Sequence, residues 1–231
     1  MQRTIITTGD GSKTIHLSEW NENYHSSHGA VQEAKHVFLK HGLDLFLGKS
    51  DIHILEVGFG TGLNAILTLE AALNSDSNIA YDGLEAFPIS NDEMVTLEYE
   101  NLLESDFLKE KYKQIHNTSW DVLKVISPSF TLTKIQNELQ KQTFIANKYD
   151  LIYFDAFGPR VQEDMWTKEI FQKLYDSLTP GGYLVTYCAK GQVKRDLKSV
   201  GFNVETLPGP PGKREMTRGG KVILREPQES K

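Results

Sequence analysis

The sequence is poor in cysteine and has no long apolar run. Its 231 residues include a single cysteine, Cys188, so no disulfide can form within the chain. The longest apolar runs, residues 151–154 and 183–185, are far too short to span a bilayer, which needs about 20 residues. Residues 1–10 also lack the apolar core of a signal peptide. These absences favour a cytoplasmic protein with no membrane partner.

The charge of the chain is unevenly distributed along its length. Hydrophobic residues make up 39% of the chain and charged residues 24%, with a net charge of −6, which fits one ordinary globular domain with or without a small appendage. Residues 190–225 hold nine Lys or Arg and three Asp or Glu, so this segment carries +6 and the remainder −12. A basic end can hold a polyanion, or its side chains can simply solvate the last elements.

Residues 1–48 are predicted to form an N-terminal extension. Two β-prone runs, residues 4–7 and 14–17, flank an Asp-Gly pair at residues 10–11, which is a hairpin turn signal. Apolar residues at helical spacing then predict a helix over residues 29–41. We expect a hairpin followed by a helix.

Residues 49–231 alternate short apolar runs with segments whose apolar residues recur at helical spacing, and we predict that they form one domain. Strands separated by helices imply βαβ units and therefore an α/β fold with a doubly wound, mainly parallel sheet of Rossmann-like type. Two further strands are expected to close the sheet at the end of the chain. The expected strands are 52–57, 79–84, 130–135, 149–154, 183–188, 202–207 and 222–224, and the expected helices are 63–73, 91–101, 165–177 and 191–200.

A glycine loop follows the first of these strands. Residues 55–64 read Leu-Glu-Val-Gly-Phe-Gly-Thr-Gly-Leu-Asn. Glycines let the backbone turn sharply and let a ligand approach it closely, and the carboxyl ends of strands are where open α/β sheets bind ligands. The alternative is a turn that only packs a helix on a strand. The predicted cofactor contacts in this loop are Glu56, Gly58, Gly60, Thr61, Gly62 and Asn64.

The spacing and charge of the loop indicate S-adenosylmethionine rather than a dinucleotide. The glycines are spaced Gly-x-Gly-x-Gly, whereas dinucleotide loops read Gly-x-Gly-x-x-Gly. The acidic Glu56 has no use beside a pyrophosphate but suits a ligand with an ammonium and a sulfonium group. Glu85 follows the second expected strand, where a carboxylate can accept two hydrogen bonds from a ribose diol. Glu85 could equally be a solvated loop carboxylate.

A second acidic strand end lies at Asp155. The apolar residues 151–154 deliver it to the same edge of the sheet as the glycine loop, and Phe157 can wall a pocket there. We predict that Asp155 contacts the cofactor bound at this edge. The alternative is a carboxylate that caps a helix or stabilises a turn.

These residues together resemble the methyltransferase domain of the MnmC family, bacterial enzymes that modify the wobble uridine of tRNA. Matches run from about Tyr24 to Lys221, nearly the whole chain. The family often has an acidic residue near the adenine after the strand at residues 130–135, whereas this chain has Gln136 and Asn137, and we assign Asn137 to that place. The matching motifs are Asn-Tyr-His-Ser at 23–26 with Gly29 and Glu33, Asp-Ala-Phe-Gly-Pro at 155–159, Asp-Met-Trp-Thr at 164–167, Gly-Gln-Val-Lys-Arg at 191–195 and Gly-Lys-Arg-Glu-Met at 212–216.

The resemblance implies methyl transfer from S-adenosylmethionine to the primary amine of an aminomethyl group on that uridine. For this reaction we assign Asp155 first to positioning the amine and second to accepting its proton. In two-domain members of the family, a flavin-dependent oxidase domain first removes a carboxymethyl group. A chain of 231 residues has no room for that domain. We therefore expect a stand-alone methyltransferase that binds the anticodon loop of tRNA, uses no FAD and no metal, and acts after a separate oxidase.

The expected RNA contacts combine basic and aromatic side chains. Basic residues neutralise phosphates, and unstacked bases of RNA loops lie against aromatic rings, although each such ring is also an ordinary core residue. The basic candidates are Lys194, Arg195, Lys213, Arg214 and Arg218, and the aromatic candidates are Tyr24, Phe157 and Trp166.

Other functions remain open at this point. One is a methyl or aminopropyl transferase for a small amine, which needs no basic end. Others are a non-catalytic RNA- or cofactor-binding module and a nicotinamide oxidoreductase, which the glycine spacing disfavours. His36 and His41 are five residues apart and do not share a face of an α-helix, so no metal site is expected there.

Overall fold

An eight-stranded sheet forms the centre of the molecule, and a three-stranded sheet lies at one end of it. The computed structural model describes residues 2–9, 11–26 and 28–223. The large sheet has the order β10-β11-β9-β8-β4-β5-β7-β6. Strands β7, β5, β4, β8 and β9 run parallel, β6 is antiparallel to β7, and β11 lies antiparallel between β9 and β10. The strands of this sheet are β4 (Asp51–Val57), β5 (Asn78–Glu85), β6 (Leu123–Ser127), β7 (Phe130–Gln136), β8 (Tyr149–Phe154), β9 (Leu178–Thr186), β10 (Asn203–Pro208) and β11 (Glu215–Gly220).

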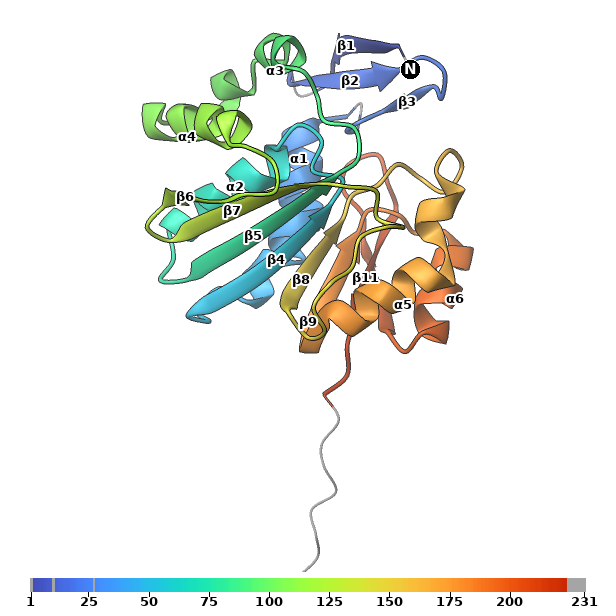
Figure 1. The fold of residues 1–231 in the computed structure, drawn as a ribbon. Coiled ribbons are helices and arrows are strands. Elements are labelled where there is room, and N and C mark those ends of the chain that lie inside the picture. Colours follow the sequence, from blue (N-terminus) through green and yellow to red (C-terminus); the bar gives the residue numbers. More distant parts are fainter. Residues whose placement is uncertain (1, 10, 27, 224–231) are drawn as a thin grey trace, which may run out of the picture.

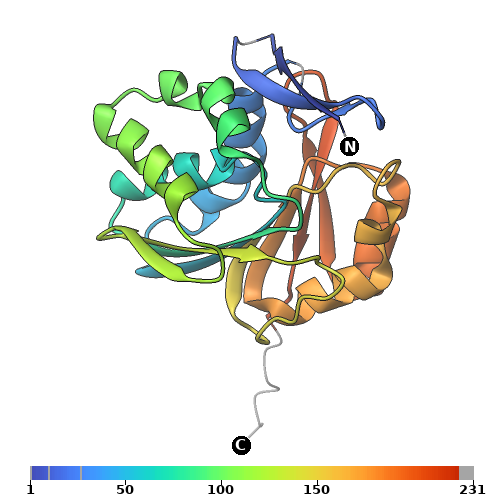
Figure 2. The ribbon, with the colours of Figure 1, turned by 45° about the horizontal axis from the view of Figure 1, so that its top comes forward.

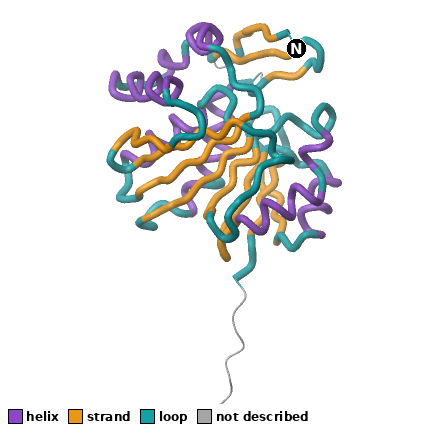
Figure 3. Tube along the Cα trace, in the orientation of Figure 1, coloured by secondary structure: helices purple, strands orange, loops and turns teal. Residues whose placement is uncertain are grey.

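Helices cover both faces of the sheet, as predicted for a doubly wound fold. In β4, Ile52 and Ile54 pack into the core shared with α1 and α2, whereas Leu55 and Val57 pack into the core shared with α5 and α6, because successive strand residues point to opposite faces. Figure 1 shows α1 and α2 behind the sheet and α5 and α6 in front of it, and Figure 3 shows the strands between the two helical layers. The α-helices are α1 (Ala30–Ala34), α2 (Leu63–Leu73), α3 (Asn91–Leu97), α4 (Asp106–Asn117), α5 (Lys168–Ser177) and α6 (Gly191–Ser199), and the short 3-10 helices are η2 (Leu43–Leu45), η3 (Tyr99–Leu102) and η4 (Glu163–Trp166).

The small sheet consists of β1 (Arg3–Thr7), β2 (Lys13–Leu17) and β3 (Glu22–Asn23). The predicted hairpin of its first two strands is confirmed by their antiparallel pairing, while Asp10 lies outside the described residues. Ile15 and Leu17 are buried in the same core as the large sheet. In Figure 2 this sheet comes forward over the upper edge of the large sheet. The extension therefore forms one wall of whatever binds at that edge.

The last strand of the sheet is not where the sequence predicts it. β11 ends at Gly220, and Val222 lies beyond it, irregular and exposed; Leu224 lies outside the described residues. A Cβ at Gly219 would stand 2.9 Å from a ring atom of Phe202. A charged, glycine-containing segment forms a strand here because neighbours on both sides supply hydrogen bonds and an aromatic ring fills the space above the glycine.

The helix predicted over residues 29–41 changes type along its length. After α1, the segment η1 (Lys35–Lys40) is a π-helix, whose wider turn brings residues five apart together. The rings of His36 and His41 consequently lie 4.8 Å apart. The expectation that these two histidines face apart, which assumed an α-helix throughout, is therefore wrong.

Helix α4 and strand β6 were not predicted. The helix begins after Ser105, whose hydroxyl accepts a hydrogen bond from the Leu108 N–H. Its buried residues Leu108, Tyr112 and Ile115 follow at helical spacing. That spacing of apolar residues is typical of an amphipathic helix, although most of the remaining side chains in the segment are polar.

Candidate active site

A cleft of about 860 Å³ opens at the carboxyl ends of β4, β5 and β8. Its walls come from the glycine loop, the ends of β5 and β8, the N-terminal extension and the loop between β10 and β11. Open α/β sheets bind ligands at this edge. The structure thus brings to one place Tyr24, Gly60, Glu85, Asp155 and Lys213.

The backbone of the glycine loop packs directly against the loop after β8. Gly58 has φ +89°, and a Cβ there would lie 2.5 Å from the carbonyl oxygen of Asp155, so only glycine fits. The Gly60 N–H donates to Glu85 Oε2 (2.9 Å), and the Phe87 N–H donates to Glu85 Oε1 (2.8 Å). Glu85 is therefore fixed on the cleft wall, and its remaining lone pairs can accept ligand hydroxyls.

Glu56 lies beneath the cleft and does not line it. The side chain is fully buried, and its carboxylate accepts hydrogen bonds from Tyr81 Oη (2.8 Å) and Asn64 Nδ2 (2.8 Å). Burial raises the pKa of Glu56 well above its usual value, against the lowering effect of both hydrogen bonds. Glu56 therefore lies behind Asn64 and is not among the residues that line the cleft, so direct contact between its carboxylate and a cofactor stays a prediction.

Asn64 links the two buried carboxyl groups. Its Nδ2 also donates to Asp155 Oδ2 at 2.9 Å. Its Oδ1 is buried and accepts no hydrogen bond from the residues that the structure describes. An unpaired buried acceptor costs about 1–3 kcal/mol, so a ligand that donates a hydrogen bond here is favoured.

Asp155 follows β8, and its carboxyl has a pKa near neutrality. Burial and the negative charge of Glu33 raise the pKa of Asp155 to about 7, against the opposing effects of the Asn64 hydrogen bond and the Lys213 charge. The carboxyl remains partly accessible, and it lines the cleft. A group with this pKa can take up and release a proton at neutral pH.

Three hydrogen bonds hold the backbone of the loop after Asp155. Tyr187 Oη donates to the Ala156 carbonyl (2.9 Å), Trp166 Nε1 donates to the Phe157 carbonyl (2.7 Å), and the Phe157 N–H donates to Gln162 Oε1 (3.1 Å). Trp166 is only 5% exposed and packs in the core. The structure therefore places Trp166 as a support for this loop and not as an accessible ring for an RNA base.

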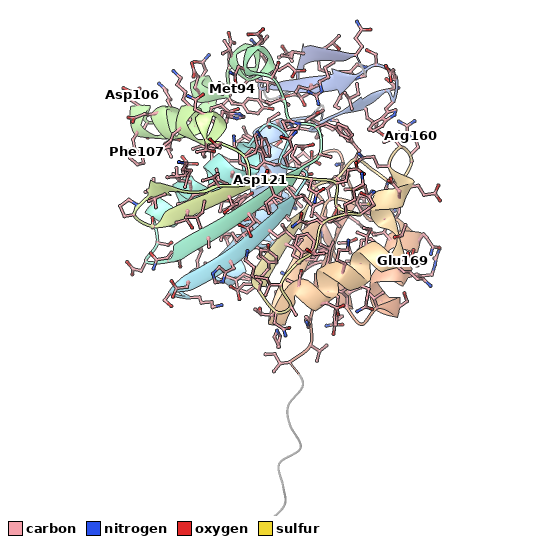
Figure 4. All side chains as sticks on the ribbon, in the orientation of Figure 1. Met94, Asp106, Phe107, Asp121, Arg160 and Glu169 are labelled. Atoms are coloured by element: carbon pink, nitrogen blue, oxygen red, sulfur yellow. The ribbon has the colours of Figure 1, made fainter. Side chains whose placement is uncertain are left out.

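Two of the predicted aromatic residues do line the cleft. Phe157 meets the edges of Tyr24 and Trp20, with ring centroids 5.1 and 5.5 Å apart. Arg160 joins the same loop to the small sheet, because its guanidinium donates to the Trp20 carbonyl (2.9 Å) and to Glu22 Oε1 (2.8 Å). Figure 4 shows Arg160 at this junction. The N-terminal extension is thus tied to the acidic strand end.

Two side chains of α4, a helix that the sequence pattern did not predict, also hold the glycine loop in place. The Thr61 carbonyl accepts hydrogen bonds from Tyr112 Oη and His116 Nε2, both at 3.0 Å. Burial lowers the pKa of His116 to about 4, so the imidazole is a neutral donor at physiological pH. Lys134 Nζ in turn donates to the His116 carbonyl (2.7 Å). Thr61 therefore serves the site through its backbone.

At the adenine side predicted from the sequence, Asn137 lines the cleft. Its Nδ2 donates to Gln142 Oε1 (2.9 Å), and its Oδ1 accepts from the Glu138 N–H (2.9 Å), so the amide is already engaged within its own loop. Phe87, which the sequence analysis missed, lines the same cleft and is 67% exposed. An aromatic residue two positions after a strand-end carboxylate was the available signal.

The basic residues of segment 190–225 are less accessible to a polyanion than their number in the sequence suggests. Lys194 pairs with Glu215 (2.9 Å), and its side chain is only 18% exposed. Arg218 pairs with Glu205 (2.8 Å) and is only 15% exposed. These two residues stabilise the β10–β11 hairpin and its contact with α6, so the prediction that they meet phosphates is corrected.

The other three basic candidates lie in two different settings. Lys213 lines the cleft and forms an ion pair with Glu33, which places it inside the site and away from the outer surface. Arg195 is exposed on α6, and the Arg214 side chain is 93% exposed beside the cleft loop. Of the five predicted residues, Arg195 and Arg214 are exposed enough to meet a polyanion, although Arg195 Nη2 donates to Gln192 Oε1 (2.7 Å) and Arg214 lies 3.7 Å from Glu215.

The residues of the cleft fit S-adenosylmethionine better than a phosphate ligand. Glu85 offers hydroxyl acceptors, Asn64 Oδ1 offers a buried acceptor, and Asp155 adds negative charge near a ligand with ammonium and sulfonium groups. Among the described residues, no cluster of three His, Cys, Asp or Glu side chains could hold a metal ion. No helix in the described part of the chain is long and apolar enough to cross a membrane.

Comparisons with known proteins agree with this geometry. Residues 98–222 match the family described as S-adenosyl-L-methionine-dependent methyltransferase. The tRNA 5-methylaminomethyl-2-thiouridine biosynthesis bifunctional protein MnmC of Cupriavidus metallidurans is 30% identical over 226 residues, which cover 92% of this chain and 33% of that protein. The protein of the same name from Hydrogenovibrio crunogenus is 29% identical over 87% of this chain and 31% of its own length. The chain thus spans about a third of these relatives.

Solved structures show the same fold. MnmC2 from Aquifex aeolicus superimposes with a TM-score of 0.77 at 22% identity, covering 99% of this chain and 73% of that chain. Spermidine synthase from Thermotoga maritima superimposes with a TM-score of 0.59 at 16% identity, covering 96% and 70%.

Proposed function

This chain belongs to the S-adenosyl-L-methionine-dependent methyltransferase family, and we propose that it methylates the primary amine of an aminomethyl group on the wobble uridine of tRNA. The observation that carries the proposal is Asp155, a carboxyl with a pKa of about 7 at the floor of the cofactor cleft. The names of the curated relatives support the choice of substrate. The product is a methylaminomethyl nucleoside.

The reaction requires one proton to leave the amine. When bound, S-adenosylmethionine supplies an electrophilic methyl carbon. Transfer of that methyl to the amine would require the substrate ammonium to give up one proton to a group that this chain supplies. An alkylammonium has a pKa near 10.4, so the chain must hold the amine and offer it an acceptor.

The cleft provides both the acceptor and the alignment. Asn64 fixes Oδ2 of Asp155, which leaves Oδ1 as the oxygen that an amine can approach. Tyr24 and Phe157 wall the space above it and exclude water, which lowers the proton affinity of a bound amine. The three hydrogen bonds on the loop after β8 hold Asp155 in a fixed position, so the amine is aligned before reaction.

The exposed arginines support an RNA substrate. Arg214 stands next to the cleft residue Lys213, and Arg195 lies on α6, the helix after β9. Each can neutralise a phosphate of the stem or loop that carries the target uridine. The amine itself must come from an upstream reaction that unmasks it, and we propose a separate oxidase for that step.

The test uses purified protein, labelled S-adenosylmethionine and bulk tRNA from cells that cannot methylate the wobble aminomethyl group. We expect label in the methylaminomethyl nucleoside. Arg214→Glu combined with Arg195→Glu should raise the KM for tRNA by about tenfold or more and reduce its salt dependence. The matched control is Lys124→Glu on the edge strand β6, which should change neither.

The rival function predicts a different pattern. An enzyme for a small amine should leave tRNA unlabelled, transfer its label to an amine such as putrescine, and ignore the arginine variants. Its fold is not an objection, since spermidine synthase has the same architecture. Label in tRNA that depends on both arginines would exclude this reading.

A further inference from the structure

Lys213 lies on the cleft wall, with its side chain 34% exposed, and contacts groups from distant parts of the chain. Its ammonium donates a hydrogen bond to Glu33 Oε1 and lies 3.9 Å from the centroid of the Tyr187 ring. Glu33 is buried on α1, and its other oxygen accepts a hydrogen bond from the Ser26 N–H at 2.8 Å. Both charges of this ion pair are therefore fixed in place.

The ion pair lines the same cleft as Asp155, and the Tyr187 ring that its ammonium contacts donates through Oη to the carbonyl of Ala156, the residue after Asp155. Of its two members, Glu33 disfavours the ionised form of Asp155, and Lys213 favours it. Each therefore acts on Asp155 with an opposite sign. The charged and titratable groups that face Asp155 are Glu33 from α1, Glu56 from β4, Tyr81 from β5, Tyr187 after β9 and Lys213 from the β10–β11 loop.

Neither charge has another evident use. Glu33 is only 8% exposed, so its carboxylate does not lie on the outer surface. The ammonium of Lys213 contacts Glu33 and the Tyr187 ring. The carboxylate of this pair is buried and its ammonium is partly exposed, so the pair loses part of its hydration on folding. A pair that lines the reaction cleft together with the acceptor is placed to adjust that acceptor.

We propose that Glu33 and Lys213 are positioning residues that tune Asp155 as the proton acceptor and so set the pH range of methyl transfer. This proposal rests on the proposed function, because it assigns the pair to the amine methylation described above. Removing Glu33 leaves the positive Lys213 unopposed and makes Asp155 more acidic. Removing Lys213 leaves the negative Glu33 unopposed and makes Asp155 less acidic.

The test compares Glu33→Gln, Lys213→Met and the double variant through the pH profile of kcat/KM. The acid limb, which reports ionisation of Asp155 in the free enzyme, should move down by about one pH unit in Glu33→Gln and up by about one unit in Lys213→Met. The double variant should fall between them. Lys124→Met removes one positive charge from an exposed residue of β6 outside the cleft and should leave the position of the limb unchanged.

A second measurement does not depend on activity. Carbon-13 NMR of protein labelled at aspartate carboxyl groups, with Asp155→Asn used for assignment, follows the titration of Asp155 directly. The same opposite shifts are expected there. The double variant leaves no unpaired buried charge and is the one best able to fold, so it keeps the test decisive if a single variant is lost.

The outcomes separate the two proposals. Limbs and titrations that stay in place, or that move in the same direction in both single variants, overturn the role of the pair. If the wild type methylates no tRNA at any pH while Asp155 still shifts in opposite directions, the proposed substrate fails and the control of Asp155 by the pair stands.

Discussion

Asp155→Asn removes the proton acceptor while keeping the size of the side chain. The amide oxygen of the replacement can still accept the hydrogen bond that Asn64 Nδ2 donates to Asp155 Oδ2 at 2.9 Å. The three hydrogen bonds that hold the following loop come from other residues. The variant therefore isolates proton acceptance from loop geometry.

The size of the loss follows from the raised pKa. The pKa of Asp155 is about 7, against 3.8 for an ordinary aspartate, a difference of about three units or about 4 kcal/mol. That is the amount by which this carboxyl eases removal of the proton from an alkylammonium. We expect Asp155→Asn to slow methyl transfer by about 10³-fold, inside the range of about 10²–10⁴ for general-base catalysis.

The assay is a single-turnover measurement of label transfer to tRNA between pH 6 and 9, with calorimetry for S-adenosylhomocysteine. The cofactor product should bind the variant within about threefold of the wild type, because positioning of the ligand also depends on Glu85 and Asn64. Asp176→Asn, an exposed change on α5, is the matched control. A folded Asp155→Asn protein that turns over within tenfold of the wild type would refute the assignment.

Three further measurements test the site, one on the same Asp155→Asn variant and two on changes at other residues. The folded-state pKa of Asp155 lies above its unfolded value, so its ionisation destabilises the fold progressively as pH rises from about 4 to about 7. Asp155→Asn should thus be more stable than wild type above pH 7, by up to about 4 kcal/mol, and equal to it near pH 4; urea unfolding across this range checks the sign, and equal stability at pH 8 would contradict it. Glu85→Gln should weaken S-adenosylhomocysteine binding by about 10–100-fold in calorimetry, because hydrogen bonds to a charged acceptor contribute about 1.5–3 kcal/mol; unchanged affinity would remove Glu85 from the cofactor site. Tyr112→Phe should cost about 1 kcal/mol in urea unfolding through the lost bond to the Thr61 carbonyl, with Tyr175→Phe as a control whose ring lies away from the cleft, and no loss would mean that His116 alone suffices there.

The local pattern of apolar residues was enough to predict which strand ends surround the cleft. The glycine loop, Glu85 and Asp155 each sit at the end of an apolar strand, and parallel strands place their carboxyl ends at one edge. A prediction of this kind needs only the period of the pattern and the residue at its end. It therefore identified three of the cleft walls without any knowledge of packing.

Elements whose formation depends on their neighbours were misplaced. β11 contains charged residues and glycines and forms because β9 and β10 hydrogen-bond to both of its edges. The apolar pair at Val222 looked more strand-like and lies outside the sheet. In the same way, η1 is a π-helix whose Val37 and Phe38 are buried in the core. The spacing of apolar residues in the sequence predicted an α-helix there and therefore did not predict that His36 and His41 lie close together.

Charge was the property least readable from the chain. The sequence by itself determined that Glu56 is ionisable, that Lys213 and Arg218 are basic, and that the glycine loop follows the end of a strand. Only the tertiary structure decided that Glu56 is buried behind Asn64, that Arg218 is paired with Glu205, and that Lys213 meets Glu33 from 180 residues away. The reason is that a strand or a turn is specified by neighbours in sequence, whereas the partner and the solvent exposure of a charge depend on which distant segments the fold brings together.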